Sequence, residues 1–133
     1  AVSDFKPKKT NKNKVKKNNK NSMTLELIKN QDILNFLGKN NKLRPKIVVG
    51  FSAETENLVN NSIKKLEEKH CDIIIANDVS KKDTGFNSDY IEVLIIQKNG
   101  KIEKLKKSKK TFIASVVAEK IINKFLFDKK NIN

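Results

Sequence analysis

The sequence KIVVGFSA at residues 46–53 decides the fold of this chain, together with a second apolar run, DIIIA, at residues 72–76. Neither run alternates between apolar and polar residues, which is typical of a strand buried on both faces of a parallel sheet. The segment between them, residues 57–70, has the apolar spacing of a helix, with Leu58, Val59, Ile63 and Leu66 turned inward. Residues 46–77 are therefore predicted to form one strand–helix–strand unit. Phe51 is predicted to lie at the carboxyl end of the first strand of this unit, where open α/β sheets bind ligands.

Composition limits the class of protein. The chain has 133 residues, of which 37% are hydrophobic, enough for a modest core in one domain. We recognise no apolar run of the roughly 20 residues that a membrane span needs, and no signal peptide. A single cysteine excludes an internal disulfide, and one cysteine with one histidine is a poor basis for a metal site. We expect a cytoplasmic protein without a protein-held metal.

The charge of the chain raises the question of nucleic-acid binding. The net charge is +14, and residues 1–22 contain eight lysines against one acid, Asp4. Arg44 is the only arginine, although nucleic-acid surfaces usually use arginine for bidentate contacts and aromatic residues for stacking. Lysine and asparagine dominate the whole chain, which indicates a bias of the coding DNA. Nucleic-acid binding is therefore kept as the less favoured alternative.

The first 45 residues are expected to lead into the central unit. Ala1-Val2 is interpreted as the end of a strand, with Asp4 at its tip, and residues 6–22 as a mobile loop. Residues 23–29 alternate as a strand would, with Met23, Leu25 and Leu27 inward. Asn30 is expected to cap a helix over residues 31–37, and Gly38 to stop it.

The segments after the central unit are predicted as a loop, a hairpin and a helix. Residues 77–90 form a long connection of the kind that is often functional. Asn99-Gly100 between two extended runs, residues 91–97 and 101–105, is a strong hairpin signal. Residues 109–127 carry apolar side chains three or four apart and predict an amphipathic helix that covers the core.

Few residues suggest chemistry of their own. Lys65 and Lys69 are four apart and share a helix face, although lysines there also complement the helix dipole without any ligand. His70 is interpreted as a helix-end cation and Cys71 as a small buried residue. We find no nucleophile–base pair and no glycine-rich phosphate loop. A strand edge beside a lysine-rich flap suits the binding of a small polyphosphate better than acid–base catalysis.

The order of the motifs resembles a known family. AVSDF, NKVKK, LELIKNQDIL, RPKIVVGFSAET, KKLEEKHCDIIIANDVS and GFNSD follow one another as in the C-terminal part of phosphopantothenate–cysteine ligase. In many bacteria this enzyme is the second half of a bifunctional coenzyme A biosynthesis protein that begins with a phosphopantothenoylcysteine decarboxylase. The resemblance covers essentially the whole chain, and it is the ordered set that makes it specific.

The resemblance implies a Rossmann-like α/β domain with a parallel sheet, flanking helices and a β-hairpin. It implies a ligase that activates the carboxylate of 4′-phosphopantothenate with CTP and Mg²⁺. An acyl-cytidylate forms, and the amine of L-cysteine then displaces CMP. The family also implies a homo-oligomer, with a dimer as its unit. Residues 1–133 are expected to be the C-terminal portion of one ligase domain, with a flap at 6–22, an α/β body at 23–127 and a tail at 128–133.

Site residues carry over by position. Lys14 matches the flap lysine that closes on the active site, and Asp4 matches an acidic nucleotide contact. The remaining matches to nucleotide-contacting positions are Gln31, Asp32, Ile33, Leu34, Phe51, Lys65 and Lys69. Gln31 replaces the usual proline, which removes a fixed φ but still permits a helix to begin there.

Two departures from the family qualify this assignment. The glycine-rich N-terminal half of the domain and the decarboxylase are not in the sequence, so we expect this portion alone to be inactive. The flap is about two residues shorter after Lys17. A non-catalytic lysine-rich nucleic-acid-binding protein, or a relic without activity, remain the alternatives.

Overall fold

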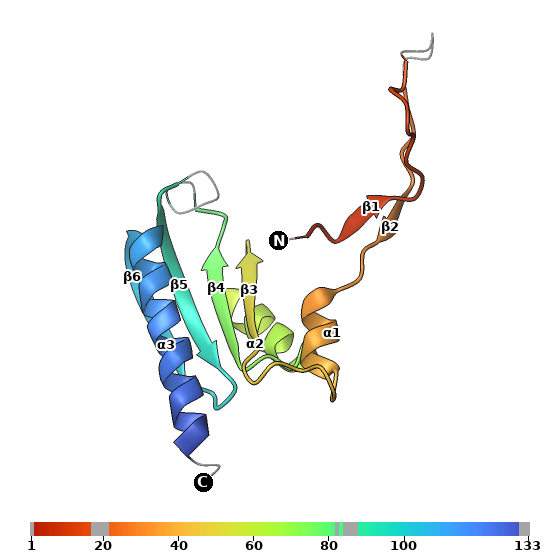
Figure 1. The fold of residues 1–133 in the computed structure, drawn as a ribbon. Coiled ribbons are helices and arrows are strands. Elements are labelled where there is room, and N and C mark those ends of the chain that lie inside the picture. The colour runs from red at the N-terminus through yellow and green to blue at the C-terminus, as the bar shows by residue number, and fades with distance from the viewer. Residues whose placement is uncertain (1, 17–21, 82, 84–87, 131–133) are drawn as a thin grey trace. The chain divides into compact units, whose positions relative to one another are not determined.

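The computed structural model describes residues 2–16, 22–81, 83 and 88–130, the last four of them by backbone alone. The chain divides into two compact units, residues 1–33 and 34–133. Each unit is described by itself (Figure 1).

The first unit is a two-stranded antiparallel ribbon. Strand β1 (Phe5–Pro7) pairs with β2 (Leu27–Lys29), with Lys6 opposite Ile28. Main-chain hydrogen bonds extend the ladder by one step at each end, from Lys8 to Glu26 (2.9 Å) and from Asn30 to Asp4 (2.8 Å). Every residue of both strands is exposed. The ribbon therefore brackets the lysine-rich segment between its strands.

The second unit is built on a four-stranded sheet in the order β3–β4–β5–β6. Strands β3 (Val49–Glu54) and β4 (Ile73–Asp78) are parallel, with Glu54 opposite Asp78 at their carboxyl ends. Strands β5 (Tyr90–Gln97) and β6 (Ile102–Lys109) continue the sheet in antiparallel fashion, with a bulge between Ile91 and Val93. The predicted α/β class, parallel pair, flanking helices and hairpin are confirmed. Because the hairpin joins the same sheet, that sheet is mixed.

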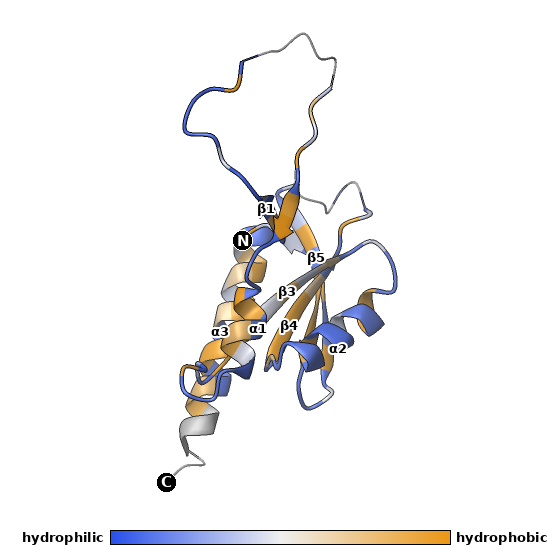
Figure 2. Ribbon diagram, turned by 90° about the vertical axis from the view of Figure 1, so that its right-hand side faces the viewer, coloured by the Kyte–Doolittle hydropathy of each residue, from blue (hydrophilic) through white to orange (hydrophobic). Residues whose placement is uncertain are grey.

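The continuous apolar run of β4 is explained by helices on both sides of the sheet. Ile74 and Ala76 belong to a core cluster with Leu66 of α2 (Leu58–Glu68). Ile73 and Ile75 belong to a second cluster with Ile113 of α3 (Lys110–Lys130). Because successive strand residues point to opposite faces, a strand covered on both faces needs apolar residues at every position. Figure 2 shows the hydrophobic colour along most of β4, whereas much of α2 is hydrophilic.

Helix α1 (Ile33–Lys39) packs on the α2 side of the sheet through Leu34. Gly38 was expected to end this helix, but it lies inside it and is buried. A Cβ atom there would lie 1.8 Å from the carbonyl oxygen of Lys69. Gly38 is therefore required by the close approach of two backbones and not by a turn.

Helix α2 ends as the apolar pattern indicated. Lys69 caps its C-terminus, and His70 follows with a left-handed φ of 53°, so the chain turns sharply into β4. Cys71 is fully buried, as predicted. Val59 was expected to face inward but is exposed, and Ser62 is fully buried in the helix instead.

The N-terminal predictions are the least accurate. The strand predicted over residues 23–29 contains only Leu27–Lys29, and Met23, Leu25 and Leu27, which were expected to face inward, are all exposed. The first strand begins after Asp4, at Phe5, and not before it. Asn30 does not cap a helix, because its side chain donates to the Ser3 carbonyl (2.7 Å) and α1 begins only at Ile33. Part of the predicted flap, residues 17–21, lies outside the described residues.

Candidate functional site

Asp4 and the segment that leads into α1 are brought together within the first unit. The main-chain N–H of Asn30 donates to the Asp4 carbonyl (2.8 Å), so Asp4 lies beside the residue that precedes Gln31. Gln31, Asp32 and Ile33 are exposed. The pairing of β1 with β2 therefore joins two of the predicted nucleotide-contacting segments, which are more than 20 residues apart in sequence.

Lys14 lies in the described part of the lysine-rich segment, and its side chain is exposed. The described residues on either side of it are exposed as well. The side chain of Lys14 is therefore open to solvent.

The sequence suggested that Phe51 lies at the end of its strand, but the structure places it inside the strand. It is the third residue of β3, which extends to Glu54, and the residue is 70% exposed. The neighbouring Gly50 faces Leu34 and Ile74, so Phe51 points to the other face of the sheet, the face that α3 covers further along. The strand is longer than its apolar run because Ser52 continues it with a buried hydroxyl that donates to Glu54 (2.7 Å).

Lys65 and Lys69 lie in the last turn of α2 and at its C-cap, and the main-chain N–H of Lys69 donates to the Lys65 carbonyl (3.0 Å). Both side chains are partly buried. Their helix covers the face of the sheet opposite to Phe51. Phe51 and these lysines therefore belong to opposite sides of the sheet, and β3 is an end strand of that sheet in the described part of the chain.

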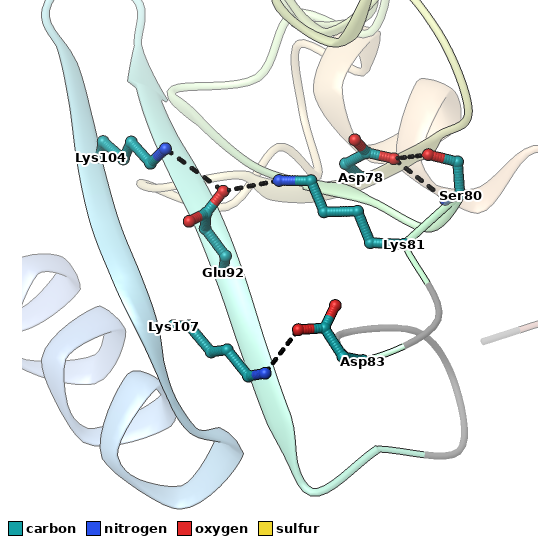
Figure 3. A network of polar contacts seen from close by, with 7 residues as sticks. All are labelled: Asp78, Ser80, Lys81, Asp83, Glu92, Lys104 and Lys107. Atoms are coloured by element: carbon teal, nitrogen blue, oxygen red, sulfur yellow. Dashed lines mark hydrogen bonds and ion pairs between the residues drawn. The ribbon is translucent and has the colours of Figure 1, made fainter.

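The structure also contains a polar network that sequence reasoning missed, at the carboxyl end of β4 (Figure 3). Lys81 and Lys104 both contact the same oxygen of Glu92, at 3.0 and 3.3 Å. Beside them, Lys107 pairs with Asp83 at 2.6 Å. These ion pairs tie the loop after β4 to the β5–β6 hairpin.

The network changes the acidity of its members. The hydrogen bond from Lys81 lowers the pKa of Glu92, and the Glu92 carboxylate in turn raises the pKa of Lys81. The pKa of Asp83 is lowered by its hydrogen bond with Lys107. The pKa of Asp78 is lowered by the hydroxyl and the main-chain N–H of Ser80, which both donate to it. All four groups are thereby held in their charged forms.

A small cavity of about 210 Å³ lies against this network. It is lined by Leu58, Asp78, Lys81, Glu92, Val93, Leu94 and Lys104. The sequence contained a partial signal for it, because residues 77–90 were predicted to form a long connection of the kind that is often functional. Residues 82 and 84–87 of that loop, including most of the GFNSD motif, lie outside the described residues.

Within the described parts of the chain, no group of three or more His, Cys, Asp or Glu side chains could hold a metal ion. No described helix is both long enough and apolar enough to cross a bilayer.

Comparisons with known proteins give the family. The DFP family, described as the DNA/pantothenate metabolism flavoprotein C-terminal domain, matches residues 1–125. The chain is 40% identical over 118 residues to the coenzyme A biosynthesis bifunctional protein CoaBC of Borreliella burgdorferi, covering 88% of this chain and 29% of that protein. It is 44% identical over 100 residues to CoaBC of Bacillus subtilis, covering 75% of this chain and 24% of that protein.

A solved structure supports the same assignment. The crystal structure of the C-terminal domain of CoaBC matches with a TM-score of 0.68 and 28% identity, over 96% of this chain and 52% of that one. The chain thus spans less than a third of the two CoaBC relatives and about half of the solved domain. On the match over residues 1–125, the chain belongs to the DFP family, the DNA/pantothenate metabolism flavoprotein C-terminal domain.

Proposed function

We propose that this chain is part of a phosphopantothenate–cysteine ligase of coenzyme A biosynthesis. The observation that carries the proposal is the family match over residues 1–125, together with CoaBC relatives that align over most of the chain. Because the chain covers about half of the solved C-terminal domain, activity is proposed for a longer protein and only nucleotide binding for this portion. We place the protein in the cytoplasm, where its substrates are made and used.

The proposed reaction has two steps. A carboxylate oxygen of 4′-phosphopantothenate attacks the α-phosphorus of CTP, and pyrophosphate leaves. The amine of L-cysteine then attacks the acyl carbon, and CMP leaves with the electron pair of the broken bond. Such chemistry depends mainly on positioning the reactants and on stabilising the negative charge that develops.

Each predicted residue has a role in this proposal. Lys14 supplies positive charge to the reacting phosphate from the flap, because its side chain is free of the core and exposed. Lys65 and Lys69 bind triphosphate oxygens from one face of α2, and the exposed ring of Phe51 offers an apolar surface to the nucleotide. Asp4 and the Gln31–Leu34 segment contribute donors and acceptors beside the base, a role supported by the hydrogen bond of Asp4 with Asn30, the residue before Gln31.

Magnesium fits this scheme as an ion that accompanies the nucleotide. Mg²⁺ usually keeps several waters and binds through one or two carboxylates plus substrate phosphates. It would neutralise charge on the triphosphate, so no dedicated cage of protein ligands is needed. The described residues contain no such cage, but they do contain isolated carboxylates such as Asp4.

We also propose that the protein assembles as a homodimer through its ribbon. An isolated two-stranded ribbon is at best marginally stable in water. The ribbon and its flanking residues expose apolar side chains that would be covered in an assembly, namely Phe5, Met23, Leu25, Leu27 and Ile28. Light scattering after size exclusion should give twice the chain mass, and Leu25→Lys with Leu27→Lys should give the monomer.

Nucleotide binding is tested by thermal unfolding with CTP and Mg²⁺. CTP should raise the unfolding temperature of this chain, Lys65→Ala should abolish most of the increase, and Asp4→Asn should reduce it. Lys64→Ala is the matched control, because Lys64 precedes Lys65 on the same helix and is 74% exposed with only a 3.8 Å contact to Glu68.

The same samples test the alternative. Binding to DNA or RNA that falls steeply with salt, is blind to sequence and is accompanied by no response to CTP would favour a lysine-rich nucleic-acid-binding protein. A chain that responds to CTP only as strongly as its Lys65→Ala variant would contradict the ligase proposal.

A further inference from the structure

Arg44 is the only arginine in a chain that otherwise uses lysine for every basic side chain except its single histidine. A compositional preference for lysine this strong indicates that position 44 needs something a lysine cannot supply. A guanidinium differs from an ammonium group by its planar fork of donors, which can reach several acceptors at fixed angles.

The contacts of Arg44 involve all three nitrogens of that fork. Its Nε donates to the Gly38 carbonyl (3.2 Å) in α1, and Nη2 donates to both the His70 carbonyl (3.0 Å) and the Asp72 carboxylate (2.9 Å). Nη1 donates to the carbonyl of the adjacent Pro45 (3.0 Å). One side chain thus connects the end of α1 to the turn that joins α2 to β4.

Asp72 extends the connection to the central strands. The Asp72 oxygen that binds Arg44 also accepts the main-chain N–H of Val48 (2.7 Å), just before β3. The ion pair is largely sheltered, with 27% of the Arg44 side chain and 15% of the Asp72 side chain exposed. We call Arg44, Asp72 and Gly38 the Arg44 clamp.

The clamp controls where α1 lies against α2. At Gly38 the two backbones approach so closely that no side chain fits beside the Lys69 carbonyl. Lys69 is one of the two lysines assigned to the triphosphate, and Leu34, one turn before Gly38, ends the segment assigned to the base. The clamp therefore fixes the spacing between two parts of the nucleotide site without belonging to either.

We infer that Arg44 is a positioning residue for the nucleotide: through Gly38 and Asp72 it fixes the distance between Leu34 in α1, which is assigned to the base, and the phosphate-contacting end of α2. The inference rests on the proposed function. A ligand held at two points gains affinity only if both points are correctly spaced, whereas a ligand held at one point is insensitive to that spacing.

The test compares CTP with inorganic triphosphate, both with Mg²⁺, by calorimetric titration of this chain. Arg44→Lys keeps the charge and removes the fork, and it should weaken CTP binding about tenfold while changing triphosphate binding by less than about twofold. Asp72→Asn should act in the same direction. Lys42→Ala, an exposed basic residue two positions away, should change neither.

The design separates the inference from the proposed function. All titrations are made where circular dichroism shows each variant to be folded, so a loss of stability alone does not alter the result. CTP binding unchanged in both Arg44→Lys and Asp72→Asn, or an equal loss for CTP and triphosphate, overturns the positioning role and leaves the proposed function in place. A different outcome is that the unaltered chain binds triphosphate no more tightly than sulfate, and CTP no more tightly than triphosphate. In that case the proposed function fails, and the inference fails with it.

Discussion

Gly50 in β3 lies directly against Ile74 in β4, so that a Cβ atom at position 50 would come within 2.7 Å of the Ile74 Cδ1 atom. The same Cβ would lie 2.8 Å from Leu34 Cδ2 and 3.3 Å from Cys71 Sγ. The space that a side chain would occupy is therefore filled by the core cluster on the α2 face of the sheet.

The two buried glycines should differ in their tolerance of alanine. Gly50→Ala meets the ends of side chains, which can shift, and should cost about 1–2 kcal/mol in the free energy of unfolding. Gly38→Ala meets the Lys69 carbonyl, which cannot rotate away, and should cost more. Urea denaturation of both variants measures the difference, and a Gly38→Ala variant as stable as Gly50→Ala would contradict the backbone contact.

Ser62 and Ser52 offer a matched pair of fully buried hydroxyls. Ser52 donates to Glu54, whereas the Ser62 hydroxyl has no hydrogen-bond partner among the described residues. An unpaired buried hydroxyl costs free energy, and alanine is the better helix former, so Ser62→Ala should stabilise the fold by up to about 1 kcal/mol. Ser52→Ala should destabilise it, as judged by the same urea titrations. A destabilised Ser62→Ala variant would show that the hydroxyl has a partner after all.

The network around Glu92 predicts a dependence of stability on pH. Lys81 and Lys104 lower the pKa of Glu92 from its ordinary value of 4.5. Because the folded-state pKa is the lower one, the carboxylate stabilises the fold above that ordinary value, and the contribution is lost as the pH falls through the lowered pKa.

Glu92→Gln should therefore be less stable than the unaltered chain at neutral pH and should lose less stability on acidification. Unfolding free energies from neutral pH to about pH 3 measure this, with the exposed Glu119→Gln as control. Curves for Glu92→Gln and the unaltered chain that stay parallel over this range would show that the pairing does not contribute.

Phe51 should matter to the ligand and not to the fold. Because Phe51 is 70% exposed, Phe51→Ala should change the free energy of unfolding by no more than about 0.5 kcal/mol. Loss of the aromatic surface should weaken CTP binding about tenfold, since stacking of a base on an aromatic ring contributes about 1–3 kcal/mol. Val49→Ala, on the same face but packed against the core, should show the reverse pattern.

The sequence was sufficient wherever structure depends on neighbours along the chain. The apolar run at residues 73–76 gave β4, Asn99-Gly100 gave the hairpin with a left-handed Gly100, and the spacing from Ile113 to Ile121 gave the buried side of α3. It was insufficient where distant segments meet. Gly38 resembles a helix stop until the Lys69 carbonyl is seen beside it, and the alternating residues 23–26 lie outside the strand that the same pattern predicted.

The candidate site was likewise predictable only where it depends on residues close together in the sequence. Lys65 and Lys69 could be assigned to one helix face from their spacing alone, and the helix is confirmed. The face on which Phe51 lies depends on where β3 begins and ends, which the apolar run did not reveal. The Lys81–Glu92 and Arg44–Asp72 pairs join residues 11 and 28 positions apart, so no local pattern marks them.

The position of β4 has a consequence for how the molecule exchanges its amide hydrogens with solvent. Neighbouring strands protect both of its edges, and helices cover both of its faces. The amides of Ile74 and Ile75 should then become accessible only when the entire sheet opens, so that their exchange rates report global unfolding. The exchange rates of these two amides, near the middle of the chain, would thus measure how often the whole second unit unfolds.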